Sequence, residues 1–372
     1  MAKRKSTGLG LLIIVILIIF TILYYLGIKY PSSSLDSSIN ANNNFPSTNN
    51  STQDNNFNSS SDSNLINSNI SVYFCPDSNN CERTILNLID SSTKSIDCAV
   101  YDLTLDSISD ALVSAKKDRN VNIRFVSDNL SSSKKTSNIG QLKASNISVI
   151  LNPDSENYMH NKFCVFDGEI SLIGSTNFTD NCIFKNNNNF VVIENKEFSN
   201  ILTEKIDSFF QGKFSQKVIS NSVKRKLDNS KLEIYFCPED DCKTKFLDVI
   251  ESSKTSLDCM FFSYTLDEAQ ISMRELKDNN SQVRVIFEKS QNSKYSEYQK
   301  LIDYNISAII DKNPNNMHNK LCIIDKKIVT TGSMNLTAHA TEENDESLLI
   351  IYDENIAKSY SNYFEKYWKS WK

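Results

Sequence analysis

The segment 159–179, MHNKFCVFDGEISLIGSTNFT, returns at 317–337 as MHNKLCIIDKKIVTTGSMNLT. The two copies agree mainly at polar and glycine positions, whereas their apolar positions have been exchanged freely. A packed core tolerates such exchange when its volume is kept, but a reacting site does not tolerate the loss of its polar groups. The repeat therefore marks the place where the chemistry of this chain is concentrated.

The similarity extends outward from these copies. Residues 70–106 reappear at 232–267, and the offset between the halves drifts between about 158 and 162 residues, as small loop insertions would cause. A period of this length is a whole domain rather than a solenoid unit. We therefore expect two tandem lobes at 69–218 and 232–372, joined by a linker at 219–231.

Each half alternates expected strands with helices. Strands are expected at 72–74, 96–101 and 121–126 in the first half, and at 234–236, 257–262 and 283–287 in the second. This alternation predicts the α/β class, with a largely parallel or mixed sheet covered by helices in each lobe. An aromatic helix closes each half, and its 3–4 spacing predicts a stripe that faces the core.

The first 68 residues have a different character. Residues 9–28 are apolar and uncharged, which is long enough to cross a bilayer, and three basic residues at 3–5 precede them. We expect an uncleaved single-pass membrane anchor within residues 1–30, with the N-terminus inside and the catalytic part outside. Residues 31–68 are rich in Ser and Asn, and we expect them to form a disordered tether.

Composition limits the possible partners. The formal net charge of the chain is -5, which argues against a protein that holds nucleic acid by bulk positive charge, although a local basic groove remains compatible with it. Histidine is scarce, with only His160, His318 and His339 in the chain. No cluster of His, Asp and Glu has the spacing of a catalytic metal site, so the sequence suggests neither a metal nor another cofactor.

The cysteines point to an oxidising compartment. Cys75 and Cys81 correspond to Cys237 and Cys242 in the second half, and we expect two local disulfides. A shared four-cysteine zinc site is the alternative. Cysteines in apolar strand-like runs are expected to be buried, inert thiols; these are Cys98, Cys164, Cys259 and Cys322.

The repeated motif can supply a complete phosphoryl-transfer site. A His-x-Lys pair on a strand places an imidazole and an ammonium on one face, as in His160 with Lys162 and His318 with Lys320. The following Gly-Ser-x-Asn segment offers a tight turn, a hydroxyl and an amide for phosphate oxygens. These side chains are Ser175 and Asn177 in the first half, and Ser333 and Asn335 in the second. If the halves meet across a pseudo-twofold, one imidazole can attack phosphorus while the other protonates the leaving oxygen.

The pattern His-x-Lys-x4-Asp followed by Gly-Ser-x-Asn, present twice, resembles the paired HKD motifs of the phospholipase D superfamily. The resemblance covers about residues 70–372 and implies two α/β/α lobes that act as a pseudo-dimer within one monomer. It also implies phosphodiester hydrolysis or transfer through a phosphohistidine, with His160, Lys162, Asn177, His318, Lys320 and Asn335 in one site. The motif aspartates, Asp167 and Asp325, would support the motif structurally.

The resemblance further implies a residue downstream that orients each histidine. Asn188 lies 28 residues after His160, and Glu346 lies 28 residues after His318. A carboxylate beside an imidazole raises its pKa more than an amide does. On this basis we expect His318 to pair with Glu346 as the general acid, and His160 to pair with Asn188 as the neutral nucleophile.

The substrate stays open at the level of sequence, because one fold serves several substrates. The expected anchor and the acidic charge favour a phospholipase D-like hydrolase that acts on phospholipids. A nuclease using the same mechanism is the alternative, since the lobes are compact, and a catalytically idle phosphate-binding module is the third possibility.

Overall fold

The computed structural model describes residues 69–217 and 231–372, which belong to one compact unit that spans Ser63–Lys372. The expected anchor, the Ser/Asn-rich segment and most of the expected linker lie outside the described residues. Within residues 69–217 and 231–372, no helix is both long and apolar enough to span a bilayer.

The described chain forms two lobes with matching element order. The first lobe contains β1 (Asn69–Cys75), α2 (Cys81–Ser91), β2 (Ser95–Val100), α3 (Asp106–Arg119), β3 (Asn122–Asp128), α4 (Asn129–Ser132), α5 (Ile139–Ala144), β4 (Ser148–Asn152), β5 (Lys162–Phe166), β6 (Ile170–Gly174), α6 (Asp180–Phe184), β7 (Asn188–Glu194) and α7 (Lys196–Phe210). The second contains β8 (Leu232–Cys237), α8 (Cys242–Glu251), β9 (Ser256–Phe261), α9 (Asp267–Asp278), β10 (Gln282–Phe287), η1 (Lys289–Gln291), α10 (Tyr298–Asp303), β11 (Ser307–Ile310), β12 (Lys320–Ile324), β13 (Ile328–Gly332), α11 (Ala338–Glu342), β14 (Glu346–Tyr352) and α12 (Glu354–Trp371).

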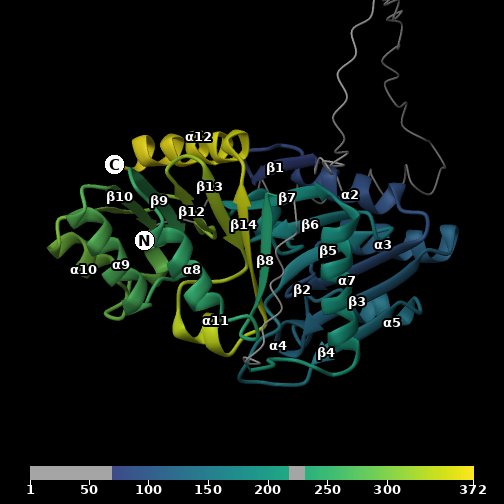
Figure 1. The fold of residues 1–372 in the computed structure, drawn as a ribbon. Coiled ribbons are helices and arrows are strands. Elements are labelled where there is room, and N and C mark those ends of the chain that lie inside the picture. The colour runs from purple at the N-terminus through teal and green to yellow at the C-terminus, as the bar shows by residue number, and fades with distance from the viewer. Residues whose placement is uncertain (1–68, 218–230) are drawn as a thin grey trace, which may run out of the picture. The chain divides into compact units, whose positions relative to one another are not determined.

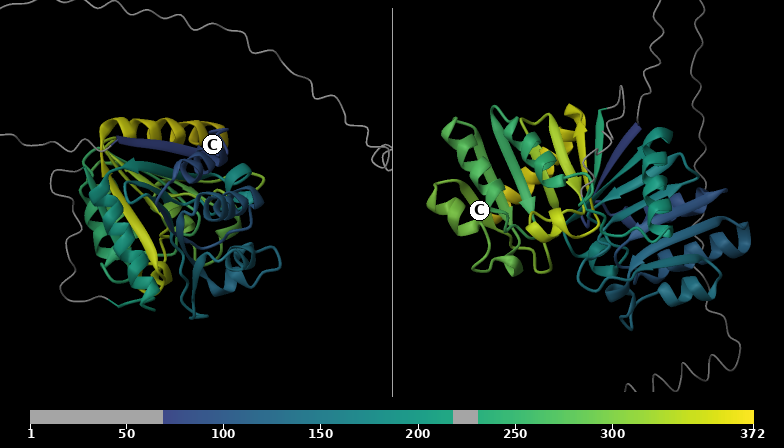
Figure 2. Two further views of the ribbon diagram at one scale, coloured as in Figure 1. Left: turned by 90° about the vertical axis from the view of Figure 1, so that its right-hand side faces the viewer. Right: turned by 60° about the horizontal axis from the view of Figure 1, so that its bottom comes forward.

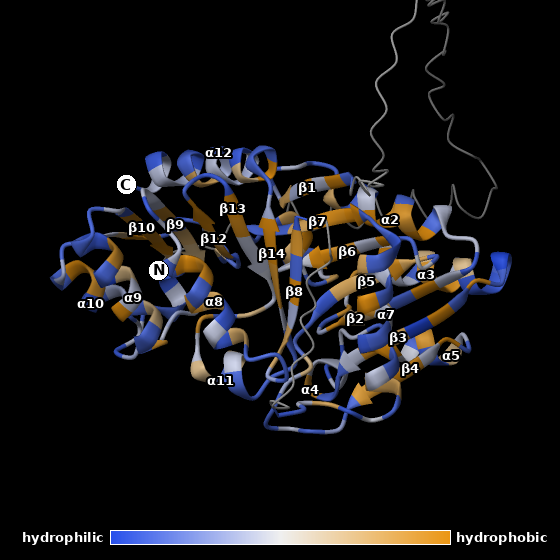
Figure 3. Ribbon diagram, in the orientation of Figure 1, coloured by the Kyte–Doolittle hydropathy of each residue, from blue (hydrophilic) through white to orange (hydrophobic). Residues whose placement is uncertain are grey.

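Each lobe is built on a seven-stranded mixed sheet. The strand order is β1-β7-β6-β5-β2-β3-β4 in the first lobe and β8-β14-β13-β12-β9-β10-β11 in the second, so the two sheets have the same topology. Strands β2, β3 and β4 run parallel, and β5, β6, β7 and β1 pair antiparallel. Figure 3 shows the strands as predominantly hydrophobic, as expected for strands buried on both faces. The prediction of two α/β lobes is confirmed.

Helices cover the sheets on the outside and join them on the inside. Helices α2, α3 and α5 pack on the sheet of the first lobe, and α8, α9 and α10 pack on the sheet of the second (Figure 1). Helix α12 also packs on β1 of the first lobe (Figure 2). The rings of Phe74 and Tyr363 stack there, with their centroids 4.2 Å apart. A single buried apolar cluster contains side chains from both sheets and from α7 and α12. The lobes are therefore held together by a shared core, which fixes the two motif strands relative to each other.

The structure joins all but one of the nine cysteines. Bridges Cys75–Cys81 and Cys237–Cys242 are local, which leaves no thiolates there for the alternative zinc site. The expectation of inert thiols in the strands is wrong: Cys98 is bridged to Cys164 and Cys259 to Cys322. Each of these pairs lies directly across an antiparallel strand pair, a register that the sequence alone did not give. Cys182 is buried and free.

Candidate active site

The two motif lysines begin the central strands β5 and β12 and are almost fully buried. Lys162 Nζ donates a hydrogen bond to the backbone carbonyl of His160 at 2.5 Å, and Lys320 Nζ does the same to His318 at 2.8 Å. Because each bond spans two residues of an extended chain, it holds the ammonium beside its own histidine. Each motif therefore presents imidazole and ammonium as one unit.

The loops before these strands cross from one lobe to the other. The backbone N–H of His160 donates to the carbonyl of Asp345 in the second lobe at 2.9 Å, and that of His318 donates to Asn187 in the first lobe at 2.8 Å. These backbone bonds are specific to the docked pair of lobes, and they place both histidines at the interface between them.

The histidine partners are exchanged between the lobes. Nδ1 of His160 lies 2.8 Å from both carboxylate oxygens of Glu346, and Nδ1 of His318 lies 2.8 Å from Oδ1 of Asn188. The pairing expected from the sequence, His318 with Glu346 and His160 with Asn188, is therefore wrong. Spacing along the chain identified the orienting residues, but β7 and β14 each extend toward the opposite lobe, which sequence spacing does not reveal.

Burial governs the electrostatics of the site. Burial, and then repulsion from Lys162 and Lys320, lowers the pKa of His160 well below its usual value, and the same causes lower that of His318. Burial lowers the pKa of Lys162 to about 8, and burial together with the charge of Lys162 lowers that of Lys320 strongly. A bound anion would stabilise this buried site, because its negative charge offsets the repulsion between the two ammoniums.

Glu346 is the carboxylate closest to this cationic group. Burial raises its pKa to about 8, while the charges of Lys162 and Lys320 act in the opposite direction. Its side chain is completely buried, and Asn344 Nδ2 also approaches it at 3.4 Å. Glu346 is thus held in place by neighbours from both lobes.

The Gly-Ser-x-Asn segments line the same interface. Ser175 Oγ donates to Asn188 Oδ1 at 3.0 Å, which orients the amide that faces His318. The backbone of Ser333 lies against His160, and that of Ser175 lies against His318. The Oδ1 atoms of Asn177 and Asn335 are buried with no hydrogen-bond partner, which leaves unused polar capacity in the site.

The repeated glycines have a steric reason. A Cβ at Gly174 would collide with the backbone oxygen of Asn189, and one at Gly332 would collide with that of Ser347. These close approaches let β6 and β13 pass against the strands that carry the orienting residues. Both glycines thus preserve the site rather than take part in it.

The motif aspartates lie away from the histidines. The carboxylate of Asp167 accepts hydrogen bonds from the backbone of Thr93, Lys94 and Ser95 at the start of β2. Asp325 receives the equivalent bonds at the start of β9. Although burial raises the pKa of Asp325, these backbone donors outweigh it and bring the pKa to about 2.

Several residues beside the site were not predicted from the sequence. The ring of Tyr101 lies 5.1 Å from that of His160, and Phe262 occupies the equivalent place 4.8 Å from His318. Tyr101 and Phe262 hold equivalent positions in the repeat, each at the end of a strand, and this was the signal in the sequence that could have identified them. His339 is exposed, its ring lies 6.1 Å from that of Tyr158 between centroids, and Tyr158 in turn contacts Tyr101.

Cys182 also lies within this site. Asn177 Nδ2 is 3.8 Å from its sulfur. Ala340 stands in the equivalent place of the second lobe. The two sides of the pocket therefore differ at this position as well as at the orienting residues.

Comparison with known proteins agrees with this geometry. The family described as "Cardiolipin synthase, PLD-like domain" matches residues 85–210 and 246–368, one segment in each lobe. A phospholipase D of Rickettsia conorii is 33% identical over 163 residues, covering 41% of this chain and 80% of the relative. A mitochondrial cardiolipin hydrolase of Chlamydomonas reinhardtii is 30% identical over 130 residues, covering 35% of this chain and 58% of the relative.

A solved structure has the same fold across both lobes. The phosphatidylserine synthase of Haemophilus influenzae superimposes with a TM-score of 0.63 at 12% identity, covering 79% of this chain and 85% of that one. Each matched segment contains one motif strand and one of the two residues that orient a histidine. The chain belongs to the phospholipase D superfamily and is a phosphodiesterase of that type.

Proposed function

We propose that this protein hydrolyses the phosphodiester bonds of phospholipids through a covalent intermediate on His160. The observation that carries this proposal is the meeting of two imidazoles and two buried ammoniums at one interface, with each imidazole fixed by the opposite lobe. Such a site holds the phosphate anion and supplies both a nucleophile and an acid without help from another group.

His160 is assigned as the nucleophile because of its partner. When its Nδ1 donates to Glu346, the lone pair of Nε2 is left to attack phosphorus. The new P–N bond places positive charge on the imidazole; this charge lowers the pKa of Glu346 from its raised value in the empty site, and the carboxylate stabilises the imidazolium. The same role for His160 was expected from the sequence, but for the opposite reason, since its partner is a carboxylate and not an amide.

His318 is assigned as the acid. The amide of Asn188 donates to the carbonyl of Cys182, so its Oδ1 is left to accept a hydrogen bond from Nδ1–H of His318. The bound phosphodiester is an anion and raises the pKa of the nearby imidazole, which favours the protonated form. As the P–O bond to the head group breaks, Nε2 of His318 gives its proton to the leaving oxygen.

The second step returns the protein to its starting state. The now neutral His318 takes a proton from water, the water oxygen bonds to phosphorus, and the P–Nε2 bond breaks. Lys162, Lys320 and the two motif asparagines stabilise the charge on the non-bridging oxygens in both steps. Phosphatidic acid leaves, and His160 is neutral again.

Three observations support a lipid substrate and an exterior location. Two relatives bear the names phospholipase D and cardiolipin hydrolase. The four disulfides are typical of an oxidising compartment. The apolar residues 9–28 are preceded by basic residues, which favours an anchor that places the catalytic unit on the outer side of the membrane.

A nuclease is the second candidate. The rings of Tyr101, Tyr158 and His339 form a chain of contacts that begins at His160, and aromatic rings beside a phosphate site can stack nucleobases. The net charge of -5 gives little non-specific attraction for a polyanion, which makes this candidate the weaker one.

One experiment separates these functions. The full chain is incubated with phosphatidylcholine vesicles, phosphatidylglycerol vesicles or single-stranded DNA, in each case with EDTA. We expect head-group release alone, together with an acid-labile phosphatidyl adduct that maps to His160. Cleavage of DNA alone would favour the nuclease, an adduct on His318 would reverse the assigned roles, and no cleavage would favour a phosphate-binding module.

A further inference from the structure

The two sides of the candidate phosphate site carry opposite charges, although equivalent elements of the two lobes form them. Helix α6 ends in Phe184 and is followed by Lys185, whereas the equivalent residues at the end of α11 are Glu342 and Glu343. The loops opposite these helices differ in the same sense. The loop before β12 carries Lys312 and Pro314, whereas the loop before β5 carries Asp154 and Glu156.

These differences gather on two sides because the loops and helices exchange between lobes. Asn313 Nδ2 donates to the carbonyl of Lys185 at 3.2 Å, which joins the Lys312 loop to α6. His339 Nε2 lies 3.1 Å from the carbonyl of Glu156, which joins α11 to the other loop. We call the first side the basic rim (Phe184, Lys185, Lys312 and Pro314) and the second the acidic rim (Asp154, Glu156, Glu342 and Glu343).

The basic rim is an exposed surface that directly adjoins the catalytic pocket. The side chain of Phe184 is 46% exposed, and the side chain of Lys312 is exposed and makes no ion pair with another described residue. Asn187 connects the rim to the site, since its side chain accepts from Asn313 at 2.6 Å and its backbone carbonyl accepts from His318. Only Asn313 and Asn187 therefore separate a ligand on this rim from His318, the proposed acid.

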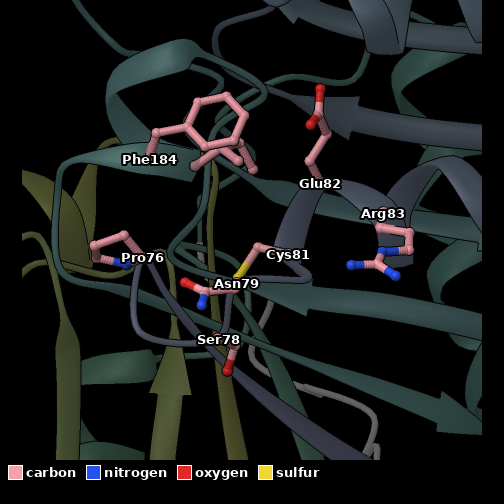
Figure 4. Close-up of a pocket in the computed structure, with 8 residues that line it drawn as sticks. Pro76, Ser78, Asn79, Cys81, Glu82, Arg83 and Phe184 are labelled. Carbon is pink, nitrogen blue, oxygen red and sulfur yellow. The ribbon is translucent and has the colours of Figure 1, made fainter. Parts of the chain in front are cut away.

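Two cavities flank Phe184. One of about 290 Å³ also contacts Pro76 and the exposed Arg83 (Figure 4). The other, of about 300 Å³, lies between Phe184, Lys312 and the aromatic side chains Tyr367 and Trp371 of α12. An apolar ring between aromatic and cationic groups matches the composition of surfaces that lie at the boundary of a bilayer.

We propose that the basic rim docks on the surface of an anionic phospholipid bilayer, an inference that rests on the proposed lipid substrate. Phe184 enters the boundary of the bilayer, and Lys185 and Lys312 face the lipid phosphates. Lys185 also pairs with Asp180, so Lys312 is the less compensated of the two. On the acidic rim Glu342 is paired with Lys243, and the other three carboxylates are repelled by the same surface, so the site meets the bilayer from one side only.

The two tryptophans of the chain provide an intrinsic probe. Trp368 and Trp371 are its only tryptophans, and Trp371 lines the cavity beside Phe184. The full chain is reconstituted into nanodiscs of brominated phosphatidylglycerol or brominated phosphatidylcholine, and quenching of tryptophan fluorescence is measured. We expect stronger quenching in the anionic discs, and Trp368→Phe should keep most of it because Trp371 is the reporter.

The repeat supplies the decisive variant. Phe184→Glu with Lys185→Glu copies the sequence that α11 already carries, so the fold accommodates it. We expect this variant to reduce the anionic quenching at least tenfold and to lower hydrolysis of bilayer lipid to a similar extent. Hydrolysis of monomeric dibutyryl phosphatidylcholine should be unchanged. The matched control, Ile271→Glu with Lys117→Glu, makes the same change of charge at an equally exposed apolar side chain (48%) and an exposed lysine elsewhere.

The outcomes distinguish docking from catalysis. Absence of quenching in anionic discs, or quenching that Phe184→Glu with Lys185→Glu leaves intact, would overturn the docking proposal even if the protein cleaves lipid. Loss of the quenching when single-stranded DNA is added would also overturn it. Quenching with no cleavage of any phospholipid would instead reject the proposed function and leave the docking surface in place.

Discussion

Both carboxylate oxygens of Glu346 in the second lobe lie 2.8 Å from Nδ1 of His160 in the first. The equivalent contact of His318 is to the amide of Asn188 at the same distance. The two histidines thus sit in matching positions with chemically different partners. This difference assigns them different roles.

Glu346→Gln should slow formation of the phosphohistidine by about 10²-fold, because an amide keeps the geometry but does not stabilise the positive charge on His160. Single-turnover trapping of the covalent adduct measures this rate. Asn188→Asp is the matched control and should leave the attack by His160 largely intact. Equal losses in the two variants would show that the carboxylate has no special role.

His318→Ala should spare substrates with a good leaving group. A nitrophenyl phosphodiester releases a weakly basic oxygen that needs little protonation, whereas a lipid head group releases an alkoxide. We expect the ratio of the two rates to rise by about 10²-fold or more in this variant. His160→Ala should lose both activities, and retention of either one would contradict its role as nucleophile.

Anion binding should weaken as the pH rises through about 8. Burial brings the pKa of Lys162 to about 8 in the empty site, so the ammonium loses its proton in that range. A bound anion favours the charged lysine, and binding of inorganic phosphate should therefore be accompanied by proton uptake. Calorimetry in buffers of different ionisation enthalpy measures this uptake, and an affinity that stays constant across pH 8 would refute the prediction.

Lys205 should stabilise the interface between the lobes. Its buried Nζ lies 2.8 Å from Glu239 and 3.3 Å from Asp345, both in the second lobe. Lys205→Met removes the cation beside the buried carboxylate of Asp345 and should lower the free energy of unfolding by about 3–5 kcal/mol. Urea denaturation measures the change, and a loss below that of exposed Lys117→Met would contradict it.

The pH dependence of this loss follows from Asp345. Burial raises its pKa to about 6, above its unfolded value, while Lys205 lowers it. A carboxyl with a raised pKa contributes stability that is lost as the pH rises through the folded pKa. Removing Lys205 raises that pKa further, so the variant should lose more stability above pH 6 than below it.

The bridge between β2 and β5 should stabilise the fold more than the local bridge before α2. Cys98–Cys164 closes a loop with a separation of 66 residues, and Cys75–Cys81 closes one of 6. Chain entropy then gives about 4 kcal/mol for the long loop and about 2 kcal/mol for the short one. Double Cys→Ala variants compared by urea unfolding test this order, and the reverse order would contradict it.

The sequence predicted much of this architecture because the repeat itself carried the information. His160, Lys162, His318 and Lys320 occur in register, so their convergence required only that equivalent lobes dock. The partners of the histidines were misassigned because Glu346 and Asn188 cross between lobes. Position along a chain does not specify which lobe a strand end will reach.

The same limitation applies to residues without a repeated motif. Cys98 and Cys164 were expected to be free because their pairing depends on the register between β2 and β5, and this register is set by tertiary packing. Tyr158 and His339 differ in residue type from their counterparts in the repeat, Asn316 and Asn181, so the repeat did not mark them as site residues. Their contact exists only once the loop of one lobe meets the helix of the other.

The exchange of partners between lobes also bears on the origin of the asymmetry. In an assembly of two identical subunits, every substitution at the orienting position would alter both histidines at once. Joining the copies in one polypeptide removes that constraint, because Glu346 and Asn188 are inherited as separate positions. Covalent fusion thus permits two imidazoles in equivalent positions to have chemically different partners.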